Sequence, residues 1–178
     1  LGPHRNDDKS VRILNRVVSW TAEGITYEPD QRHAEIIIKR LGLQGKKSIS
    51  SPGVKPGNDK DEEKDDEFLE RERATEYRKL VARANYLAQD RSDIGFATKE
   101  LSRRMSRPRN RDWRSLVRLG KYLIGRERHV TKFNYQKNVG KIDVWTDTDY
   151  AGCRETRKST SGGLIMLGSH LIRTWSST

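Results

Sequence analysis

The stretch EYRKLVARANYLAQDRSDIGFATKELSRRM, residues 76–105, decides how the middle of this 178-residue chain folds. Its apolar residues recur three or four positions apart, the spacing that places side chains on one face of a helix. The first stripe consists of Tyr77, Leu80, Val81, Ala84, Leu87 and Ala88, and the second of Ile94, Ala97, Leu101 and Met105. The pattern predicts two helices whose stripes lie in a core, with Ser92 or Asp93 as the cap of the second.

A third helix is predicted after Pro108, with Asn110 as its cap and Gly125 as its end. Its predicted buried face consists of Trp113, Val117, Gly120 and Ile124. Residues 68–128 are therefore interpreted as a helical segment of three helices.

The N-terminal segment, residues 1–43, has a different pattern. VRILNRVVSW (11–20) is rich in β-branched residues and predicts one strand, TAEG a turn, and ITYEP (25–29) a returning strand, which together form a β-hairpin. DQRHAEIIIKRLGL (30–43) predicts a helix with Asp30 as N-cap, Gly42 as its end, and Ala34, Ile37, Ile38 and Leu41 on one face.

The remaining segments complete the predicted architecture. Residues 44–67 contain two Pro-Gly breaks and then a charge run, a composition typical of a flexible linker. Residues 129–178 contain four short strand-like stretches, HVTKFNY, KIDVWTD, GGLIMLGS and LIRTWSS. We expect an α+β fold: a hairpin plus helix, a three-helix connection, and part of a mixed sheet.

Composition favours an acidic polymer as the partner. The net charge is +11, and this basic excess makes nucleic acid the first candidate. The single Cys153 excludes an internal disulfide, and no apolar run reaches the length of a membrane span or forms a signal-peptide core. We expect an intracellular protein of the cytoplasm or nucleus, with no membrane partner.

The basic residues are concentrated on and before the third predicted helix. Arg111, Arg114, Arg118 and Lys121 are three, four and three positions apart, and SRRMSRPRNR adds Arg103, Arg104, Arg107 and Arg109. Guanidinium groups bind phosphate and release condensed counterions, so such a row suits a nucleic-acid backbone and predicts binding without sequence preference. The alternative is a solvated helix face that binds nothing.

Two aspartates mark the end of a predicted strand in IDVWTDTDYAG, residues 142–152. Asp147 and Asp149 are two apart, so in a strand they project to the same side. Paired carboxylates could hold Mg²⁺ for phosphodiester hydrolysis. The alternative is a pair of turn-forming aspartates, which are common at strand ends.

Three stretches resemble Pol polyproteins of copia-type LTR retrotransposons. RILNRVVSWTAEGITYEPDQRHAEIIIKRLGL (12–43) is similar to the hairpin and helix that close the reverse transcriptase. EYRKLVARANYLAQDRSDIGFATKELSRRMSRP (76–108), followed by WRSLVRLGKYLIG (113–125), looks like the segment after the polymerase fingers and palm. DTDYAGCRETRKSTSGGLIMLGSHLIRTWSS (147–177) resembles the start of the ribonuclease H domain.

The resemblance implies a domain order and a function. Residues 1–43 would end a reverse transcriptase, 44–67 would be a flexible charged linker, 68–128 a helical connection, and 129–178 the truncated N-terminal part of a ribonuclease H-like domain. Asp147 matches the first carboxylate of that domain, a Mg²⁺ ligand in the family. Asp149 matches the second aspartate of the same element, and we assign it no catalytic role.

The same comparison predicts limits on catalysis. In the family the polymerase aspartates lie upstream of residue 1 and further ribonuclease H carboxylates lie beyond Thr178. We therefore expect an RNA–DNA hybrid as partner, no stably bound Mg²⁺ and no catalysis by this chain, although the parent family is an RNA-directed DNA polymerase with ribonuclease H activity. The alternative is a host-retained, non-enzymatic basic subunit that binds a protein partner at an open sheet edge.

Overall fold

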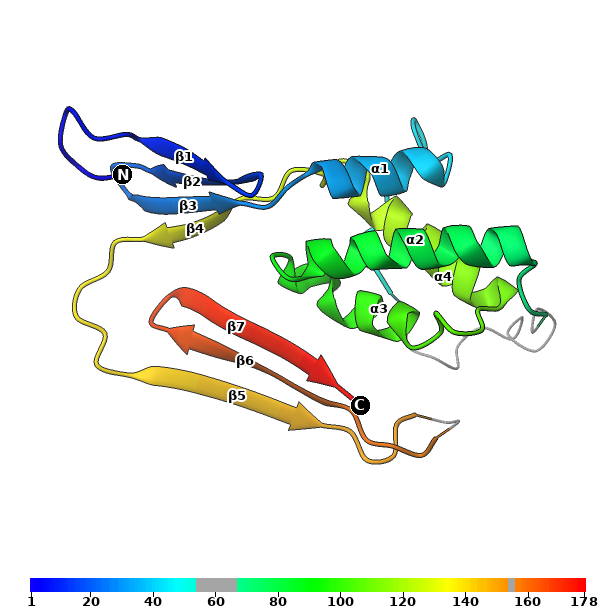
Figure 1. The fold of residues 1–178 in the computed structure, drawn as a ribbon. Helices are drawn as coiled ribbons and strands as arrows, with labels where there is room; N and C mark the ends of the chain where they lie inside the picture. Colours follow the sequence, from blue (N-terminus) through cyan, green and yellow to red (C-terminus); the bar gives the residue numbers. More distant parts are fainter. Residues whose placement is uncertain (54–66, 154–155) are drawn as a thin grey trace. The chain divides into compact units, whose positions relative to one another are not determined.

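The structure is a computed structural model that describes residues 1–53, 67–153 and 156–178 (Figure 1). The chain divides into two compact units. The sheet unit combines Leu1–Asp30 with Val130–Thr178, and the helical unit spans Gln31–His129. The predicted linker 44–67 falls within the span of the helical unit, and most of it, residues 54–66, lies outside the described residues.

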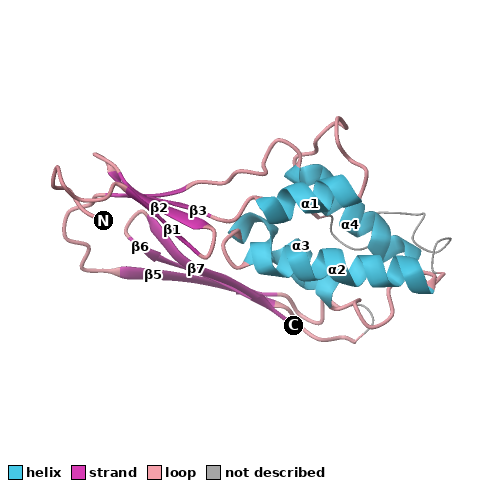
Figure 2. Cartoon of the chain, turned by 45° about the horizontal axis from the view of Figure 1, so that its top comes forward, coloured by secondary structure: helices cyan, strands magenta, loops and turns pink. Residues whose placement is uncertain are grey.

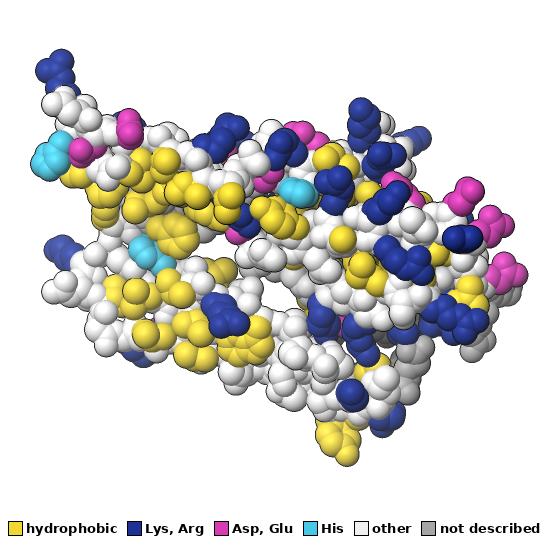
Figure 3. Space-filling view, viewed as in Figure 1, with side chains coloured by type: hydrophobic (Ala, Val, Ile, Leu, Met, Phe, Trp, Pro, Cys, Tyr) yellow, Lys and Arg dark blue, Asp and Glu magenta, His cyan; other side chains and the backbone are white. Residues whose placement is uncertain are grey.

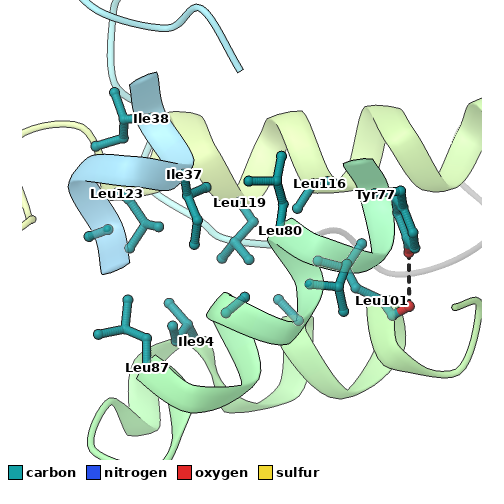
Figure 4. Close-up of a cluster of buried hydrophobic side chains, with 14 of the residues drawn as sticks. Ile37, Ile38, Tyr77, Leu80, Leu87, Ile94, Leu101, Leu116, Leu119 and Leu123 are labelled. Carbon is teal, nitrogen blue, oxygen red and sulfur yellow. Dashed lines mark hydrogen bonds between the residues drawn. The ribbon is translucent and has the colours of Figure 1, made fainter. Parts of the chain in front are cut away.

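The described part of the helical unit is built from α1 (Arg32–Arg40), α2 (Arg71–Ala88), α3 (Ser92–Ser102) and α4 (Asn110–Leu123) (Figure 2). The stripes predicted for α2 and α3 are confirmed except at their last residues: the others form one buried cluster (Figure 4), whereas Ala88 and Met105 are only partly buried and Met105 lies beyond the end of α3. The Tyr77 hydroxyl lies inside this core, where it donates a hydrogen bond of 2.8 Å to the carbonyl oxygen of Leu101. That bond joins α2 to α3 and satisfies a polar atom that burial would otherwise leave unpaired.

Helix α1 ends as predicted. Gly42 has a φ of +64°, and its N–H donates to the carbonyl of Lys39 while the N–H of Leu43 donates to that of Ile38. These two bonds form a Schellman motif, which requires the left-handed conformation that glycine adopts without steric cost. The predicted start is wrong by one residue: the first helical acceptor is the carbonyl of Gln31, so Gln31 is the N-cap and Asp30 precedes it.

The predicted caps of α3 and α4 are also displaced by one residue or more. The N-cap residues are Arg91 and Arg109, and neither side chain was a sequence candidate. At α4 the Asp112 carboxylate reaches back and accepts a hydrogen bond of 2.8 Å from the backbone N–H of Arg109. The acidic residue in the third helical position thus does the capping that was assigned to Asn110.

The buried face of α4 is rotated from the predicted one. Leu116, Leu119 and Leu123 are fully buried, whereas Trp113 and Val117 are only partly buried. At about 100° per residue, the two faces are centred roughly 90° apart. Since α4 contacts α1, α2 and α3, its apolar arc is broad and the leucines take its centre.

The N-terminal stretch predicted as one strand over 11–20 is two strands. β1 (Ser10–Ile13) and β2 (Arg16–Trp20) pair antiparallel, and Leu14 and Asn15 between them have φ values of 49° and 63°. Two consecutive residues with positive φ form the tight turn favoured in two-residue hairpins. Asn15, which tolerates this conformation, was the overlooked sign of the turn.

Two further strands extend this sheet. β3 (Gly24–Glu28) pairs with β2, and β4 (Thr131–Asn134), from the other part of the sheet unit, pairs with β3. The order is β1-β2-β3-β4, with every pair antiparallel. The predicted returning strand at 25–29 is confirmed as β3.

A second sheet contains β5 (Ile142–Thr148), β6 (Ser161–Leu167) and β7 (His170–Ser177) in that order, all antiparallel. Several of its large apolar side chains are solvent-exposed: Val144 and Trp145 on β5 are 55% and 53% exposed, and Ile172 on β7 is 55% exposed. Separate helices and antiparallel sheets confirm the α+β fold class, and the second sheet is compatible with a ribonuclease H-like fragment. Among the described helices, none has the length and apolar character needed to cross a bilayer.

Candidate nucleic-acid interface

Positive charge is concentrated in the helical unit. Residues 31–129 contain 25 Lys and Arg against 16 Asp and Glu, whereas the sheet unit contains 11 against 9. The helical unit therefore carries a net +9 of the chain's +11. Figure 3 shows Lys and Arg side chains over the helical unit on the face that it displays. An anionic polymer is attracted first to the unit with the larger net charge.

The predicted row on α4, here called the α4 rail, consists of Arg111, Arg114, Arg118 and Lys121. At about 100° per residue, these side chains lie on roughly the opposite side of α4 from the buried leucines. Arg114 is exposed and the other three are partly exposed. The structure thus brings the four predicted residues together on the outer face of a helix whose inner face is fixed in the core.

The two cations in the C-terminal half of the rail, Arg118 and Lys121, are not neutralised by an ion pair with a described residue. Nε of Arg118 is buried without a hydrogen-bond partner among the described residues. The buried Nε cannot meet a phosphate, but the exposed part of the Arg118 guanidinium has no carboxylate to displace when a phosphate approaches.

The other four predicted arginines lie in the α3–α4 loop, residues 103–109, which α2 holds in place. Arg78 on α2 donates from Nε to the carbonyl oxygen of Met105 at 2.7 Å and from Nη2 to that of Ser106 at 3.1 Å. Arg78 was not predicted as part of this region, because nothing local marks an arginine that reaches carbonyls 27 and 28 residues away.

Phe68 holds the same loop from its other side. The guanidinium carbon of Arg107 lies 3.6 Å from the centroid of the Phe68 ring, and that of Arg109 lies 4.7 Å away. The backbones of Phe68 and Arg109 also form a β-bridge. Cation–π contacts of this kind orient guanidinium groups without neutralising them, so Arg107 remains an exposed cation on an anchored loop.

Carboxylates offset part of the charge near the start of α4. Burial raises the pKa of Asp112, and the hydrogen bond from the Arg109 N–H and the charges of Arg104, Arg111 and Arg109 oppose that rise only in part. Arg103 pairs with Glu100 at 3.3 Å. Arg103, Arg104, Arg109 and Arg111 thus lie near the carboxylates of Asp112 or Glu100, whereas Arg118 and Lys121 make no ion pair with a described residue.

The two aspartates predicted as a metal site have different surroundings. Asp147 is exposed on β5, opposite Gly162 of β6. Asp149 lies just beyond β5, where its carboxylate accepts a hydrogen bond from the N–H of Thr160 and its own N–H donates to the carbonyl of Thr160. Asp149 thus organises the end of the hairpin, which is the turn-forming role considered as the alternative.

The described residues do not assemble further ligands around these aspartates. Across residues 1–53, 67–153 and 156–178, no group of three or more His, Cys, Asp or Glu side chains is placed to hold a metal ion. Asp147 offers a single exposed carboxylate, and Asp149 is engaged in its turn. This donor set does not fit a two-metal hydrolytic site.

Comparison with known proteins relates the chain to transposon proteins. It is 37% identical over 103 residues to the retrovirus-related Pol polyproteins from transposons RE2 and RE1 of Arabidopsis thaliana, a stretch covering 58% of this chain and 7% of each polyprotein. It is also 31% identical over 102 residues to an uncharacterized mitochondrial protein of the same plant, covering 57% of this chain and 42% of that protein.

The chain thus spans a small part of the polyproteins it matches. No protein-family model matches it, and no solved structure gives a significant match. Over 58% of its length, this chain is homologous to retrovirus-related Pol polyproteins of plant transposons.

Proposed function

We propose that the helical unit binds the phosphate backbone of an RNA–DNA hybrid without sequence preference. The observation that carries this proposal is the α4 rail, a row of four cations opposite the buried face of α4 in a unit with net charge +9. From Arg111 to Lys121 the rail is about 15 Å long at 1.5 Å per residue. That length is similar to the axial rise of about four nucleotides of one strand in a DNA duplex, so the rail can lie along several successive phosphates.

The chemistry of the rail supports backbone contact rather than base reading. Its four residues are cations, which bind phosphate whatever the base sequence; arginine can also pair with guanine edges, so the lack of sequence preference is part of the proposal. Contacts to phosphate fix the register of a protein on a duplex but carry no sequence information. Binding is therefore electrostatic, and its affinity falls steeply as salt rises.

We further propose that the chain derives from a copia-type Pol polyprotein. Residues 1–43 would close the reverse transcriptase, 68–128 would form the connection, and 129–178 would begin the ribonuclease H domain. The RKSTSG and WSS motifs support this assignment, together with the homology to Pol polyproteins. In a complete ribonuclease H domain Asp147 would be one Mg²⁺ ligand, and we propose no hydrolytic step for the residues described here.

One experiment tests both hybrid binding and the absence of hydrolysis. Labelled RNA–DNA hybrid is titrated with the chain across a salt series with Mg²⁺ present, and the products are resolved on a gel. We expect binding that weakens steeply with salt and leaves the RNA intact. Absence of binding at low salt would contradict the backbone interface. Cleavage of the RNA that disappears in Asp147→Asn would contradict the proposal that this chain does not catalyse hydrolysis.

A second candidate function, protein interaction, is favoured by the sheet β5-β6-β7. Its edge strand β5 carries Ile142, Val144 and Trp145, each more than half exposed. An edge strand with unpaired backbone groups can accept a strand from a partner protein. If the hybrid does not bind and a β5 charge substitution, Val144→Lys, abolishes self-association or partner capture, this second function replaces the first.

A further inference from the structure

An aromatic pair in the sheet unit lines a pocket that the α4 rail does not involve. Trp20, the last residue of β2, and Tyr135, which follows β4, have ring centroids 5.5 Å apart and ring planes inclined by 56°. Together with Pro3, Lys9, Thr21 and Ala22 they line an open pocket of about 510 Å³. This volume lies within the range of about 300–1,000 Å³ that is usual for small-ligand sites.

Backbone hydrogen bonds hold the two rings in place. The N–H of Trp20 donates to the carbonyl of Lys9 at 2.8 Å, and the N–H of Tyr135 donates to that of Glu23, also at 2.8 Å. These bonds involve only main-chain groups. Substitution of either side chain therefore leaves the hydrogen bonds in place. The site therefore belongs to the folded sheet and is not a chance contact between mobile side chains.

The shape of the pair limits how a ligand can enter. Rings inclined by 56° with centroids 5.5 Å apart leave no parallel slot between them for another ring. Tyr135 is, however, 55% exposed, so much of the residue is accessible to a ligand. A planar ligand thus stacks on the accessible part of Tyr135, with Trp20 as the support behind it.

The charge of the lining selects the class of ligand. Lys9 donates from Nζ to the carbonyls of Gly2 at 2.8 Å and His4 at 2.6 Å, which leaves one of its three N–H donors and its full positive charge. The pocket lining contains this cation and no carboxylate. It therefore disfavours a cationic ligand such as a methylated lysine and favours a planar ring that carries an anionic group.

We propose that the Trp20–Tyr135 pocket is a stacking site for one nucleotide of a single-stranded nucleic acid. The base stacks on Tyr135, and the adjoining phosphate lies against Lys9. Aromatic platforms beside a cation bind single strands with little sequence preference, because every base has a stacking face. This site goes beyond the proposed duplex interface, since it recognises an unpaired base and lies in the other unit.

The test compares two labelled oligomers of about ten nucleotides, within the usual site size, at one salt concentration. One is oligo(dT), and the other has the same phosphates but abasic sugars. We expect the full chain to bind oligo(dT) more tightly than the abasic oligomer. Tyr135→Ala should lower affinity for oligo(dT) by roughly five- to 100-fold, the usual effect of losing one stacking partner, and leave the abasic oligomer unaffected.

Three control variants separate stacking from folding and from charge. Tyr135→Phe keeps the ring and should keep the preference for bases, whereas Tyr150→Ala removes a tyrosine that is 95% exposed and should change nothing. Neutralising the α4 rail should weaken both oligomers alike and preserve their ratio. Equal binding of both oligomers by the unmodified chain, or an unchanged ratio in Tyr135→Ala, would overturn the stacking site while leaving the rail untouched.

Discussion

The guanidinium of Arg91, which is 1% exposed, holds the Asp93 carboxylate through two hydrogen bonds of 2.8 and 2.6 Å. A third bond from this guanidinium, from Nη1, goes to the carbonyl of Arg126 at 2.8 Å, and the hydroxyl of Tyr122 donates to Asp93 at 2.9 Å. The start of α3 is thereby fastened to the end of α4. The helix that carries the rail is thus fixed at its C-terminal end by a buried ion pair.

Replacing Asp93 should destabilise the helical unit. Asp93→Asn removes the negative charge and leaves the buried Arg91 cation without its partner, for which we expect a loss of about 2–3 kcal/mol in the free energy of unfolding. This loss is smaller than the roughly 3–5 kcal/mol expected for a fully buried pair, because the Asp93 side chain is 25% exposed. Urea denaturation measures it, with the exposed Glu72→Gln on α2 as the control. A loss equal to that of the control would contradict the structural role of the pair.

Mild acid should destabilise the same region through His129. Burial, and then the charge of Arg91, lower the pKa of His129 below its ordinary 6.5, although Asp93 opposes this. The unfolded chain therefore binds a proton first as pH falls, so stability is lost as pH decreases from about 6.5 toward the lowered pKa.

Urea midpoints measured between about pH 7.5 and 5 test the role of His129. His129→Gln should flatten the decline in this window. His4→Gln, in the exposed N-terminal loop, should retain the decline of the unmodified chain. An undiminished slope in His129→Gln would show that other groups cause the acid sensitivity.

Protonation of Asp93 should cause a second loss of stability at lower pH. Burial alone would raise its pKa, but the hydrogen bonds and charge of Arg91 and the Tyr122 hydroxyl outweigh burial and lower it below 3.8. The ionised Asp93 carboxylate therefore contributes to stability above about pH 4. This contribution is lost as pH falls through the lowered pKa of Asp93. In Asp93→Asn the decline below about pH 4 should therefore be shallower than in the unmodified chain.

Gly24 should tolerate no side chain. It has a φ of +153°, and a Cβ at this position would overlap the carbonyl oxygen of Phe133 on β4. Gly24→Ala should separate β3 from β4 and expose their amides to hydrogen exchange. Gly140→Ala, where an added Cβ meets nothing within 4 Å, is the matched control in the same unit. Unchanged protection of Ile25 and Phe133, which face each other across β3 and β4, would refute this prediction in Gly24→Ala.

Local sequence patterns predicted the buried stripes of α2 and α3 and the glycines that end α1 and α4. They did not predict the residues that cap the N-termini of the helices. The stripes on α2 and α3 combine aliphatic side chains at regular spacing, and Gly42 and Gly125 end helices with φ values of +64° and +72°. The predicted caps were wrong because only the first polar residues of each helix were considered, whereas at α4 the capping group is the acidic residue in the third helical position. Asp112, assigned no role from sequence, turned inward to cap α4.

Contacts distant in the chain were beyond any local pattern. The pairing of β3 with β4, for example Ile25 with Phe133, joins segments on either side of the helical unit. The α4 rail was predictable because its spacing depends on helix geometry alone. The Trp20–Tyr135 pocket was not, since the two rings meet only after β4 joins the sheet.

The central claim, that the α4 rail contacts phosphate, is tested most directly by two charge-matched triple variants. Arg114→Gln, Arg118→Gln and Lys121→Gln remove three cations of the rail, whereas Lys39→Gln, Lys46→Gln and Lys47→Gln remove three exposed lysines elsewhere in the helical unit. The measurement is hybrid affinity against salt concentration, with matched urea midpoints confirming that both variants fold. We predict that the slope of log affinity against log salt falls by about 0.9 for each lost phosphate contact in the rail variant and stays nearly unchanged in the lysine variant. Equal losses in both variants would show that net charge alone attracts the hybrid, and would contradict the rail.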